Sequence, residues 1–353
     1  MTTMINGSQL IAGTESREGK HPFSGSNPRT KQPLSQPFFD ATHQEIDQAL
    51  QAARVAFEET RSYPSGRLAK FLDQVAQEIE KLGDQLLQTA DEETGLGINR
   101  LEGERARTTG QLRKFAALLR EGSYAEAIID TAQPDRQPAP RPSIRRMLFP
   151  LGPVAVFSAS NFPFAFAVAG GDSASAFAAG CPVIVKGHPS HPATSELFGR
   201  AINRAVAGLS FPPGFFSLIQ GISIDVGQTL VTHPDLAAIG FTGSLRAGRS
   251  LFDAAAARPK PIPVYAEMGS LNPVVLLPGA LAERGQAILE GFIHSVTLGS
   301  GQFCTNPGLV FLIDGPETEA FASDLAGRMA ELQPGVLLNA NIEKGLADVV
   351  DRT

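Results

Sequence analysis

Between residues 153 and 257 the sequence alternates between short apolar stretches and longer amphipathic ones. The apolar stretches are "PVAVFSA", "CPVIVKG", "FSLIQG" and "LAAIGFTG". The amphipathic stretches between and after them are "GGDSASAFAAG", "SELFGRAINRAVAG", "GQTLVTH" and "LRAGRSLFDAAAA". Strands that alternate with helices in this way are typical of an α/β fold built on a parallel sheet. The chain is therefore predicted to be an α/β protein.

The segments on either side of this region have a different character. Residues 1–40 are rich in Gly, Ser, Pro and Thr, and they predict an irregular arm with one or two hairpins. Residues 41–124 carry apolar side chains at helical spacing, with Thr42 as a candidate N-cap, and they predict successive helices. A proline-rich connector, "TAQPDRQPAPRP" at 131–142, separates these helices from the alternating region.

The composition restricts the class of protein further. A length of 353 residues suits two domains, and 42% hydrophobic with 19% charged residues is typical of a globular protein. Lysine and arginine are scattered and the net charge is -6, so we do not expect a nucleic-acid partner. The sequence lacks a recognisable leader and a membrane-length apolar run, and its two cysteines lie far apart. We expect a cytoplasmic enzyme with no membrane partner.

Cys304 lies among small and polar residues in "GQFCTNPG" at 301–308. A catalytic thiol needs a base, because a free thiol is mostly protonated near neutral pH, and it needs donors for an oxyanion. Asn161 follows a predicted strand in "SASNFPFAF" and could donate to an oxyanion, and Glu267 lies among apolar residues in "YAEMGSLNP" and could act as a base. The stretch "GFTGS" at 240–244 could bring backbone amides and a helix N-terminus to a pyrophosphate.

Each of these features has a simpler structural explanation. Cys304 could be a core residue, Asn161 could belong to an ordinary turn, and Glu267 could be a surface carboxylate. The "GFTGS" stretch could be a loop without function. None of the four signals is specific when it is taken alone.

Two further features are interpreted as structural. Cys181 begins a predicted strand between "AAG" and "PVIVK", and it is predicted to be a small core residue. His188 and His191 have a spacing that metal ligands can have, but no further His or Cys cluster accompanies them. No metal is expected.

Taken together and in this order, the stretches resemble the motifs of the aldehyde dehydrogenase superfamily, from the N-terminal arm to the last residue. "NFP" is similar to its oxyanion-asparagine motif, "KGHP" to its ribose-lysine motif, "FTGS" to its cofactor loop, "EMGS" to its general-base motif and "GQFC" to its nucleophile motif. The resemblance implies that Cys304 is the nucleophile and Glu267 the base. It implies that Asn161 and the backbone N–H of Cys304 bind the oxyanion. It implies cofactor contacts from Lys186, His188, Pro189, Ser158, Phe241, Thr242, Gly243 and Ser244.

A narrower resemblance is to the 2,5-dioxovalerate (α-ketoglutarate semialdehyde) dehydrogenases. It rests on "FPFAFAVAGGDSASAFAAGCPVIVKGHPSHPATSEL", "AEMGSLNPV" and "RARTTGQLR". Commoner branches read Glu-Leu-Gly-Gly-Lys at the base motif, where this chain reads Glu-Met-Gly-Ser-Leu. This resemblance implies oxidation of 2,5-dioxopentanoate to 2-oxoglutarate through a cysteine thiohemiacetal and thioester, with NADP or NAD as the cofactor.

The resemblance also implies where the substrate enters. Its tunnel would be lined by Phe162 and Phe166, which follow the oxyanion motif, and by one face of the helix that carries Arg107 and Gln111. Arg107 and Gln111 are four residues apart and so share a helical face. An arginine there could bind the distal carboxylate of a dicarboxylic semialdehyde. The alternative is a solvated arginine, because the arginines of this stretch cannot all point inward.

The cofactor preference rests on two positions. Pro189 stands where many NAD-preferring relatives carry a glutamate, so a repulsion against a 2′-phosphate is absent. NADP-preferring relatives often supply an arginine near residue 224, but this chain reads "SIDVG" with Asp225. We expect use of both cofactors or a preference for NADP.

The resemblance divides the chain into a Rossmann-type cofactor domain and an incomplete α/β catalytic domain. Residues 1–122 and 143–262 would form the NAD(P)-binding domain, residues 123–142 a connector to an oligomerisation arm, and residues 263–353 the N-terminal part of the catalytic domain. Family members continue further, so the resemblance implies an unfinished sheet edge with exposed apolar surface. It also implies a homo-oligomer in the full-length family. Two alternatives stay open: an inactive fragment that at most binds a dinucleotide, and a cofactor-independent esterase.

Overall fold

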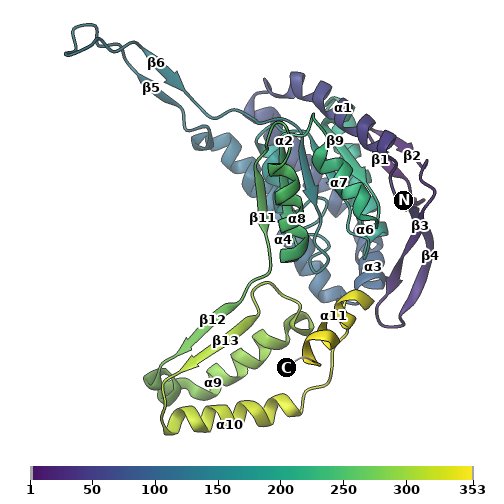
Figure 1. Cartoon of the computed structure of the whole chain (residues 1–353), viewed down its shortest axis with the longest axis vertical. Helices are drawn as coiled ribbons and strands as arrows, with labels where there is room; N and C mark the ends of the chain where they lie inside the picture. Colours follow the sequence, from purple (N-terminus) through teal and green to yellow (C-terminus); the bar gives the residue numbers. More distant parts are fainter. Residues whose placement is uncertain (1–2, 352–353) are drawn as a thin grey trace.

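The structure is a computed structural model that describes residues 3–351. Figure 1 shows a central sheet flanked by helices, a hairpin that projects from one end and a smaller lobe at the other end, where the chain finishes. None of the helices within the described residues has the length and apolar character needed to cross a bilayer.

Within residues 3–351 the central sheet has seven strands, of which five neighbouring ones are parallel. In spatial order they are β11 (Val264–Glu267), β10 (Ala238–Thr242), β7 (Val154–Phe157), β8 (Val183–Lys186), β9 (Phe216–Ile219), β1 (Gln9–Ile11) and β2 (Thr14–Ser16). Strand β1 runs antiparallel to β9, and β2 runs antiparallel to β1. The chain runs outward from β7 to β9 and then returns to add β10 and β11 on the other side of β7. The predicted parallel α/β sheet is confirmed, with a topological switch point between β7 and β10.

Helices cover both faces of this sheet. The strands are connected by α5 (Gly171–Ala178), α6 (Pro192–Gly208), α7 (Ile224–Thr232) and α8 (Leu245–Ala256). The predicted helical region before the sheet forms α1 (His43–Thr60), α2 (Ser65–Glu80), α3 (Gly83–Thr94) and α4 (Ile98–Glu121). One buried cluster unites the sheet with α2 to α6, and a second unites it with α1, α7 and α8. The predicted Thr42 cap is confirmed, because Thr42 and Glu45 form a reciprocal capping box.

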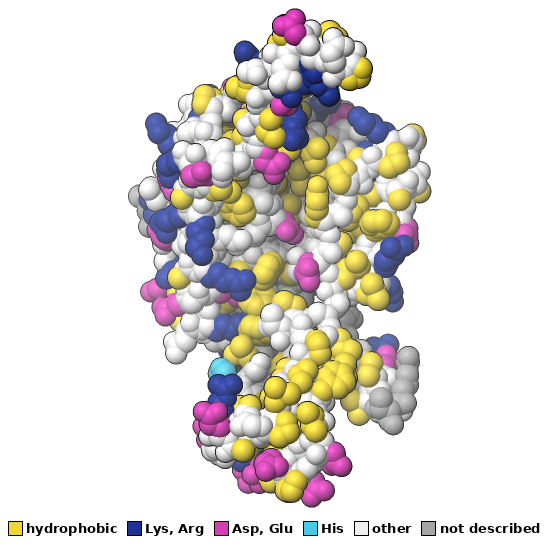
Figure 2. Space-filling view, turned by 90° about the vertical axis from the view of Figure 1, so that its left-hand side faces the viewer, with side chains coloured by type: hydrophobic (Ala, Val, Ile, Leu, Met, Phe, Trp, Pro, Cys, Tyr) yellow, Lys and Arg dark blue, Asp and Glu magenta, His cyan; other side chains and the backbone are white. Residues whose placement is uncertain are grey.

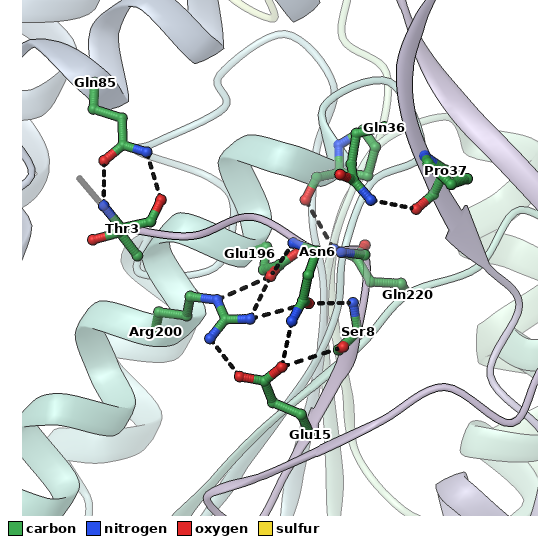
Figure 3. A network of polar contacts seen from close by, with 12 residues as sticks. Thr3, Asn6, Ser8, Glu15, Gln36, Pro37, Gln85, Glu196, Arg200 and Gln220 are labelled. Carbon is green, nitrogen blue, oxygen red and sulfur yellow. Dashed lines mark hydrogen bonds and ion pairs between the residues drawn. The ribbon is translucent and has the colours of Figure 1, made fainter.

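The N-terminal segment is fastened to α6 by a polar network (Figure 3). Arg200 donates to Glu196 at 2.7 Å and to Glu15 at 2.6 Å, and Glu196 accepts the backbone N–H groups of Asn6 and Gly7 at 3.0 and 2.8 Å. The hydrogen bond from Arg200 lowers the pKa of Glu15 to about 2. Strands β1 and β2 are therefore held at the sheet edge by charge pairing as well as by their ladder.

The projecting element is a hairpin of β5 (Ile128–Asp130) and β6 (Ile144–Arg146). Ile128 pairs with Arg146, so the predicted boundary between arm and cofactor domain at residues 142 and 143 falls inside the hairpin. On the other side of the predicted boundary at residues 262 and 263, β11 pairs with β10 in the central sheet. The division of the chain into domains stays a prediction.

The smaller lobe follows β11. Strands β12 (Asn272–Leu276) and β13 (Pro307–Leu312) form a parallel pair that packs against α9 (Pro278–Thr297) and α10 (Pro316–Ala330). Val275, Leu309 and Phe311 of the two strands are exposed, and Figure 2 shows hydrophobic side chains gathered on this lobe. The expected exposed apolar surface is thus present.

The last helix returns to the N-terminal region. Helix α11 (Ala340–Val350) lies near the hairpin of β3 (Pro22–Asn27) and β4 (Gln32–Phe39) in Figure 1. Lys31 of that hairpin pairs with Glu343 at 2.7 Å. Asn339, which caps α11, donates to the Ser190 hydroxyl at 3.0 Å. The end of the chain therefore contacts both the β3–β4 hairpin and the loop between β8 and α6.

A buried carboxylate, Glu93, joins α3 to the start of α6. It accepts the backbone N–H groups of Ala193 and Thr194, both at 2.8 Å, and the Thr194 hydroxyl at 2.7 Å. Burial raises the pKa of Glu93, while these hydrogen bonds lower it. Burial has the larger effect, and the pKa is about 7. The folded protein therefore keeps this proton to a higher pH than the unfolded chain does.

This raised pKa predicts a pH-dependent stability. The stabilising contribution is complete below pH 4.5, the ordinary pKa of the group, and is lost as the pH rises through about 7. The loss amounts to at most about 3 kcal/mol. The test is urea unfolding of the wild type and of Glu93→Gln from pH 4.5 to 7.5. The free energy of unfolding of the wild type should fall relative to that of Glu93→Gln as the pH rises. Parallel stability curves for the two proteins would contradict the assignment.

Candidate active site

The sheet register brings the predicted residues to one edge. Phe157 at the end of β7 lies opposite both Lys186 on β8 and Phe241 on β10, and Thr242 lies opposite Glu267 on β11. All four strands are parallel, so the segments that follow them gather at the same edge of the sheet. In doubly wound sheets the crevice at the switch point is the usual place for a nucleotide.

Ser158 and Lys186 lie at the carboxyl ends of β7 and β8, beside the switch point, with donors suited to a dinucleotide. The Ser158 hydroxyl is buried and has no hydrogen-bond partner within the described residues. The Lys186 ammonium donates to the carbonyl oxygens of Gly187, at 3.0 Å, and Gly221. Burial lowers the pKa of Lys186 to about 8, so the group remains largely charged at neutral pH. A buried hydroxyl without a partner and a confined ammonium fit the oxygen-rich ribose and phosphate of a dinucleotide.

His188 and Pro189 lie in the loop between β8 and α6. The Nδ1 of His188 accepts the Ser190 N–H at 3.1 Å, and its ring stacks on His191 with centroids 5.5 Å apart. Burial, helped by the charges of His191 and Lys186, holds the pKa of His188 well below its usual range. A contact from His188 would therefore come from a neutral ring.

The 240–244 stretch ends β10 and starts α8. The Gly243 N–H donates to the Glu267 carbonyl at 3.0 Å, and Ser244 caps α8 by accepting the Ala247 N–H at 3.3 Å. A Cβ on Gly243 would lie 2.7 Å from the Phe241 ring, so a larger residue there would require the ring to shift. The first turn of α8 is exposed, which leaves a helix N-terminus open at the carboxyl end of β10. Such a terminus suits a pyrophosphate.

Asn161 lies in the turn that follows β7, and it contacts the loop that carries Cys304. Its side-chain Nδ2 donates to the Gln302 carbonyl at 2.8 Å. An asparagine amide has two N–H groups, so one donor remains beyond this bond. The two segments are 141 residues apart in sequence, and this hydrogen bond brings the predicted oxyanion donor to the predicted nucleophile loop.

The Cys304 loop is conformationally constrained although the thiol residue is exposed. Gly299, Ser300 and Gly301 all have left-handed backbone, with φ of +58°, +57° and +75°. A Cβ on Gly299 would lie 2.5 Å from the Phe303 ring, so only glycine fits there. Non-glycine residues in this region are strained and tend to gather at functional sites.

Glu267 ends β11, and its surroundings differ from those expected. Burial alternates along β11, so Val264 and Ala266 are half-buried while Tyr265 and Glu267 are exposed. The apolar setting predicted for Glu267 is therefore wrong, because its apolar neighbours face the opposite side of an edge strand. The carboxylate and the Cys304 thiol share no hydrogen bond in the part of the chain that the structure describes. They are linked through the backbone, since Ser270 and Asn272 both donate to the Cys304 carbonyl, Asn272 at 2.8 Å.

Three of the four predicted substrate residues come together. The rings of Phe162 and Phe166 meet edge to face with centroids 5.2 Å apart, and the Arg107 guanidinium lies 5.5 and 5.0 Å from them. Gln111 lies one helical turn further along α4, half-buried, with its amide against Gly171. The neighbouring arginines contact other residues: Arg105 donates to the Gly83 carbonyl, and Arg113 pairs with Glu80 at 2.7 Å.

Two residues that sequence reasoning missed lie on the same helical face. Arg100 donates to the Asn161 carbonyl at 2.6 Å, and Glu104 accepts the Phe164 N–H at 2.8 Å. With Arg107 and Gln111 they form a polar series at intervals of three and four residues along α4. That spacing is the signal that could have identified them. Cys181 is buried as predicted, and residues 3–351 hold no group of three or more potential metal ligands.

Comparisons with a family model and with curated proteins agree on one protein family. Residues 14–345 match the model of the aldehyde dehydrogenase family. The chain is 50% identical to alpha-ketoglutaric semialdehyde dehydrogenase 2 of Azospirillum brasilense and 44% identical to alpha-ketoglutaric semialdehyde dehydrogenase of Acinetobacter baylyi, over 98% of its own length. It spans 64% and 65% of the length of these two relatives.

Solved structures share the fold. Betaine aldehyde dehydrogenase of Staphylococcus aureus, solved in complex with NAD+, superposes with a TM-score of 0.84 at 19% identity, covering 98% of this chain and 68% of that one. The NAD-dependent benzaldehyde dehydrogenase of Corynebacterium glutamicum superposes with a TM-score of 0.80 at 21% identity, covering 99% and 74%.

Proposed function

Because this chain belongs to the aldehyde dehydrogenase family, we propose that it oxidises an aldehyde to a carboxylic acid, with NAD or NADP, through a covalent intermediate on Cys304. The observation that carries this proposal is the hydrogen bond from Asn161 to the Gln302 carbonyl at 2.8 Å. It joins an amide donor in the turn after β7 to the loop of an exposed thiol. Acyl chemistry on a thiol needs that combination of nucleophile and oxyanion donor.

The residues divide the reaction between them. Glu267 takes the proton of the Cys304 thiol through a water molecule, and the thiolate adds to the aldehyde carbon to form a thiohemiacetal. The free N–H of the Asn161 amide and the backbone N–H of Cys304 donate to the oxyanion. When bound, the nicotinamide ring supplies the hydride acceptor that turns the thiohemiacetal into a thioester. Glu267 returns its proton to solvent and then takes a proton from a water molecule, which attacks the thioester carbon, so that the carboxylic acid leaves and the Cys304 sulfur is freed.

The dinucleotide would be held by donors at the carboxyl ends of β7, β8 and β10. Lys186 and Ser158 would bind its ribose and phosphate oxygens, and the N-terminus of α8 after Ser244 would bind its pyrophosphate. We infer that NADP is accepted at least as well as NAD. Pro189 brings no carboxylate toward a 2′-phosphate, and Asp225 is paired with His43 at 2.7 Å.

We propose 2,5-dioxopentanoate, α-ketoglutarate semialdehyde, as the substrate and 2-oxoglutarate as the product. The proposal is supported by the names of the two relatives above and by the position of Arg107 over Phe162 and Phe166. Arg107 is exposed and, unlike Arg113, makes no ion pair with a carboxylate within the described residues. A guanidinium in that state can form a bidentate pair with the distal carboxylate of a substrate.

Replacing Arg107 by alanine tests this assignment. KM for 2,5-dioxopentanoate should rise about 10- to 100-fold, because a charge-assisted hydrogen bond contributes about 1.5–3 kcal/mol. KM for an aldehyde without a carboxylate, such as propanal, should not change. Arg113→Ala is the matched control, since Arg113 lies on the same helix but pairs with Glu80. An equal rise in KM for both aldehydes would contradict a contact with the carboxylate.

The decisive measurement is absorbance at the NAD(P)H band with the purified chain, 2,5-dioxopentanoate and either NADP or NAD. Steady reduction supports the proposed function, and a kcat/KM for NADP no lower than for NAD supports the cofactor assignment. Absence of reduction in a chain shown to be folded would favour the inactive alternative. Hydrolysis of a p-nitrophenyl ester without cofactor, in a chain that reduces neither nucleotide, would favour the esterase alternative.

We also propose that the β5–β6 hairpin mediates self-association. Ile129, Ile144 and Phe149, on and beside the hairpin, are exposed apolar side chains on an element that projects from the molecule (Figure 1). Exposed apolar surface of this kind marks interaction sites. Sedimentation of the chain over a range of concentrations tests the proposal, and a monomer at all concentrations would oppose it.

A further inference from the structure

Arg100 of α4 contacts both halves of the candidate active site. Its guanidinium donates to the Asn161 carbonyl at 2.6 Å, and it lies 5.2 Å from the centroid of the Phe162 ring. On its other side it lies 4.7 Å from the centroid of the Phe303 ring. Phe162 directly follows the proposed oxyanion donor and Phe303 directly precedes the proposed nucleophile. One side chain therefore spans the two segments that carry the chemistry.

The two aromatic rings also contact each other. Phe162 and Phe303 meet edge to face with centroids 4.9 Å apart. The Arg100 Nη1 lies 3.2 Å from the position that a Cβ on Gly299 would occupy, so the guanidinium also fills the space beside the start of the nucleophile loop. The cluster of Arg100, Phe162 and Phe303, here called the aromatic clamp, thus connects α4, the oxyanion turn and the Cys304 loop.

Glu104 supports this cluster from one turn further along α4. Its Oε1 accepts the N–H groups of Phe164 and Ala165 at 2.8 and 2.9 Å, which holds the turn after Asn161. Its other oxygen, Oε2, is buried without a hydrogen-bond partner and lies 3.9 Å from an Arg100 nitrogen. The charge of Arg100 therefore compensates a carboxylate that would otherwise be costly to bury.

We infer that Arg100, supported by Glu104, is a positioning residue that holds the Asn161 amide and the Cys304 thiol at a fixed separation. Arg100 acts through its contacts with Phe162 and Phe303, and it touches no reacting atom. The proposed function supplies the reason for this role, because an oxyanion donor contributes only when it lies at hydrogen-bond distance from the developing charge. Misplacement by about 1 Å is enough to lower the rate of a reaction about 100-fold.

The test compares Arg100→Ala, Arg100→Lys and, as the matched control, Arg113→Ala. In R100A, hydrogen exchange of the backbone amides in segments 159–166 and 299–306 should become faster by about tenfold or more, since both lose the contacts that order them. R113A should match the wild type in both segments. R100K keeps a donor for the Asn161 carbonyl but not the planar stack, and it should lie between wild type and R100A. If R100A does not fold, R100Q, which keeps most of the stem without the charge, takes its place.

Kinetics provide the second readout. With 2,5-dioxopentanoate, R100A should lower kcat about 100-fold and change KM by no more than about threefold, because positioning affects the transition state more than binding. Unchanged exchange in the Cys304 loop of R100A, or the same effects in R113A, would overturn the inference. If the wild type proves inactive, the proposed function fails, and the exchange comparison still decides whether Arg100 orders both segments.

Discussion

Replacement of Cys304 by alanine is expected to abolish aldehyde oxidation while leaving the fold and dinucleotide binding intact. The thiol residue is exposed on a loop held from both sides, by Asn161 through Gln302 and by Asn272 through the Cys304 carbonyl. Its side chain contributes little to packing, so its removal should cost little stability. Without the sulfur no thiohemiacetal can form, and the rate should fall by at least about four orders of magnitude, as for other covalent nucleophiles.

The measurement is NAD(P)H absorbance for C304A, together with the fluorescence of added NADPH as a check on dinucleotide binding. Cys181→Ala is the control, because Cys181 is the other cysteine of the chain and is 3% exposed. C181A should keep the activity at wild-type level, although the small cavity it leaves lowers stability somewhat. Residual oxidation by C304A near the wild-type rate would rule out the covalent route.

Replacement of Glu267 by glutamine is expected to leave the second half of the reaction slow. Glutamine keeps the size of the side chain but cannot accept a proton, so water attack on the thioester loses its base. The steady rate should fall about 10²- to 10⁴-fold, the range typical of general-base removal. The first turnover needs less help, because a cysteine is partly thiolate near neutral pH. A burst of NAD(P)H equal to the enzyme concentration should therefore precede the slow phase.

Rapid-mixing absorbance separates the burst from the steady phase. Glu290→Gln is the matched control, since Glu290 is an exposed carboxylate of α9 that accepts a hydrogen bond from Gln286 at 2.9 Å. E290Q should show neither a burst nor a slower steady rate. Ordinary turnover by E267Q would remove Glu267 from the mechanism. Since the carboxylate is exposed on an edge strand, this outcome is the sharpest test of the motif-based assignment.

The placement of the candidate cofactor residues at the strand ends could be predicted from the sequence because these residues are local to the strands. Ser158, Lys186 and Thr242 each stand at or directly after the end of a short apolar stretch, and parallel strands carry their ends to one edge. Local patterns determine that kind of placement. The same reasoning failed for Glu267, because its apolar neighbours on β11 face the opposite side of the strand. The sequence of an edge strand does not by itself show which of its two faces packs against other elements.

What the sequence by itself determined is the parallel α/β sheet, the succession of helices before it, the Thr42 cap and the set of motifs at the strand ends. These depend on periodicity, capping and short-range composition, which act between residues close in the chain. Only the tertiary structure decided that Asn161 meets the Cys304 loop, that Arg107 stacks on Phe162 and Phe166, and that Arg100 joins both segments. These contacts join residues about 55 to more than 200 positions apart in the sequence, and their geometry depends on how the whole chain packs.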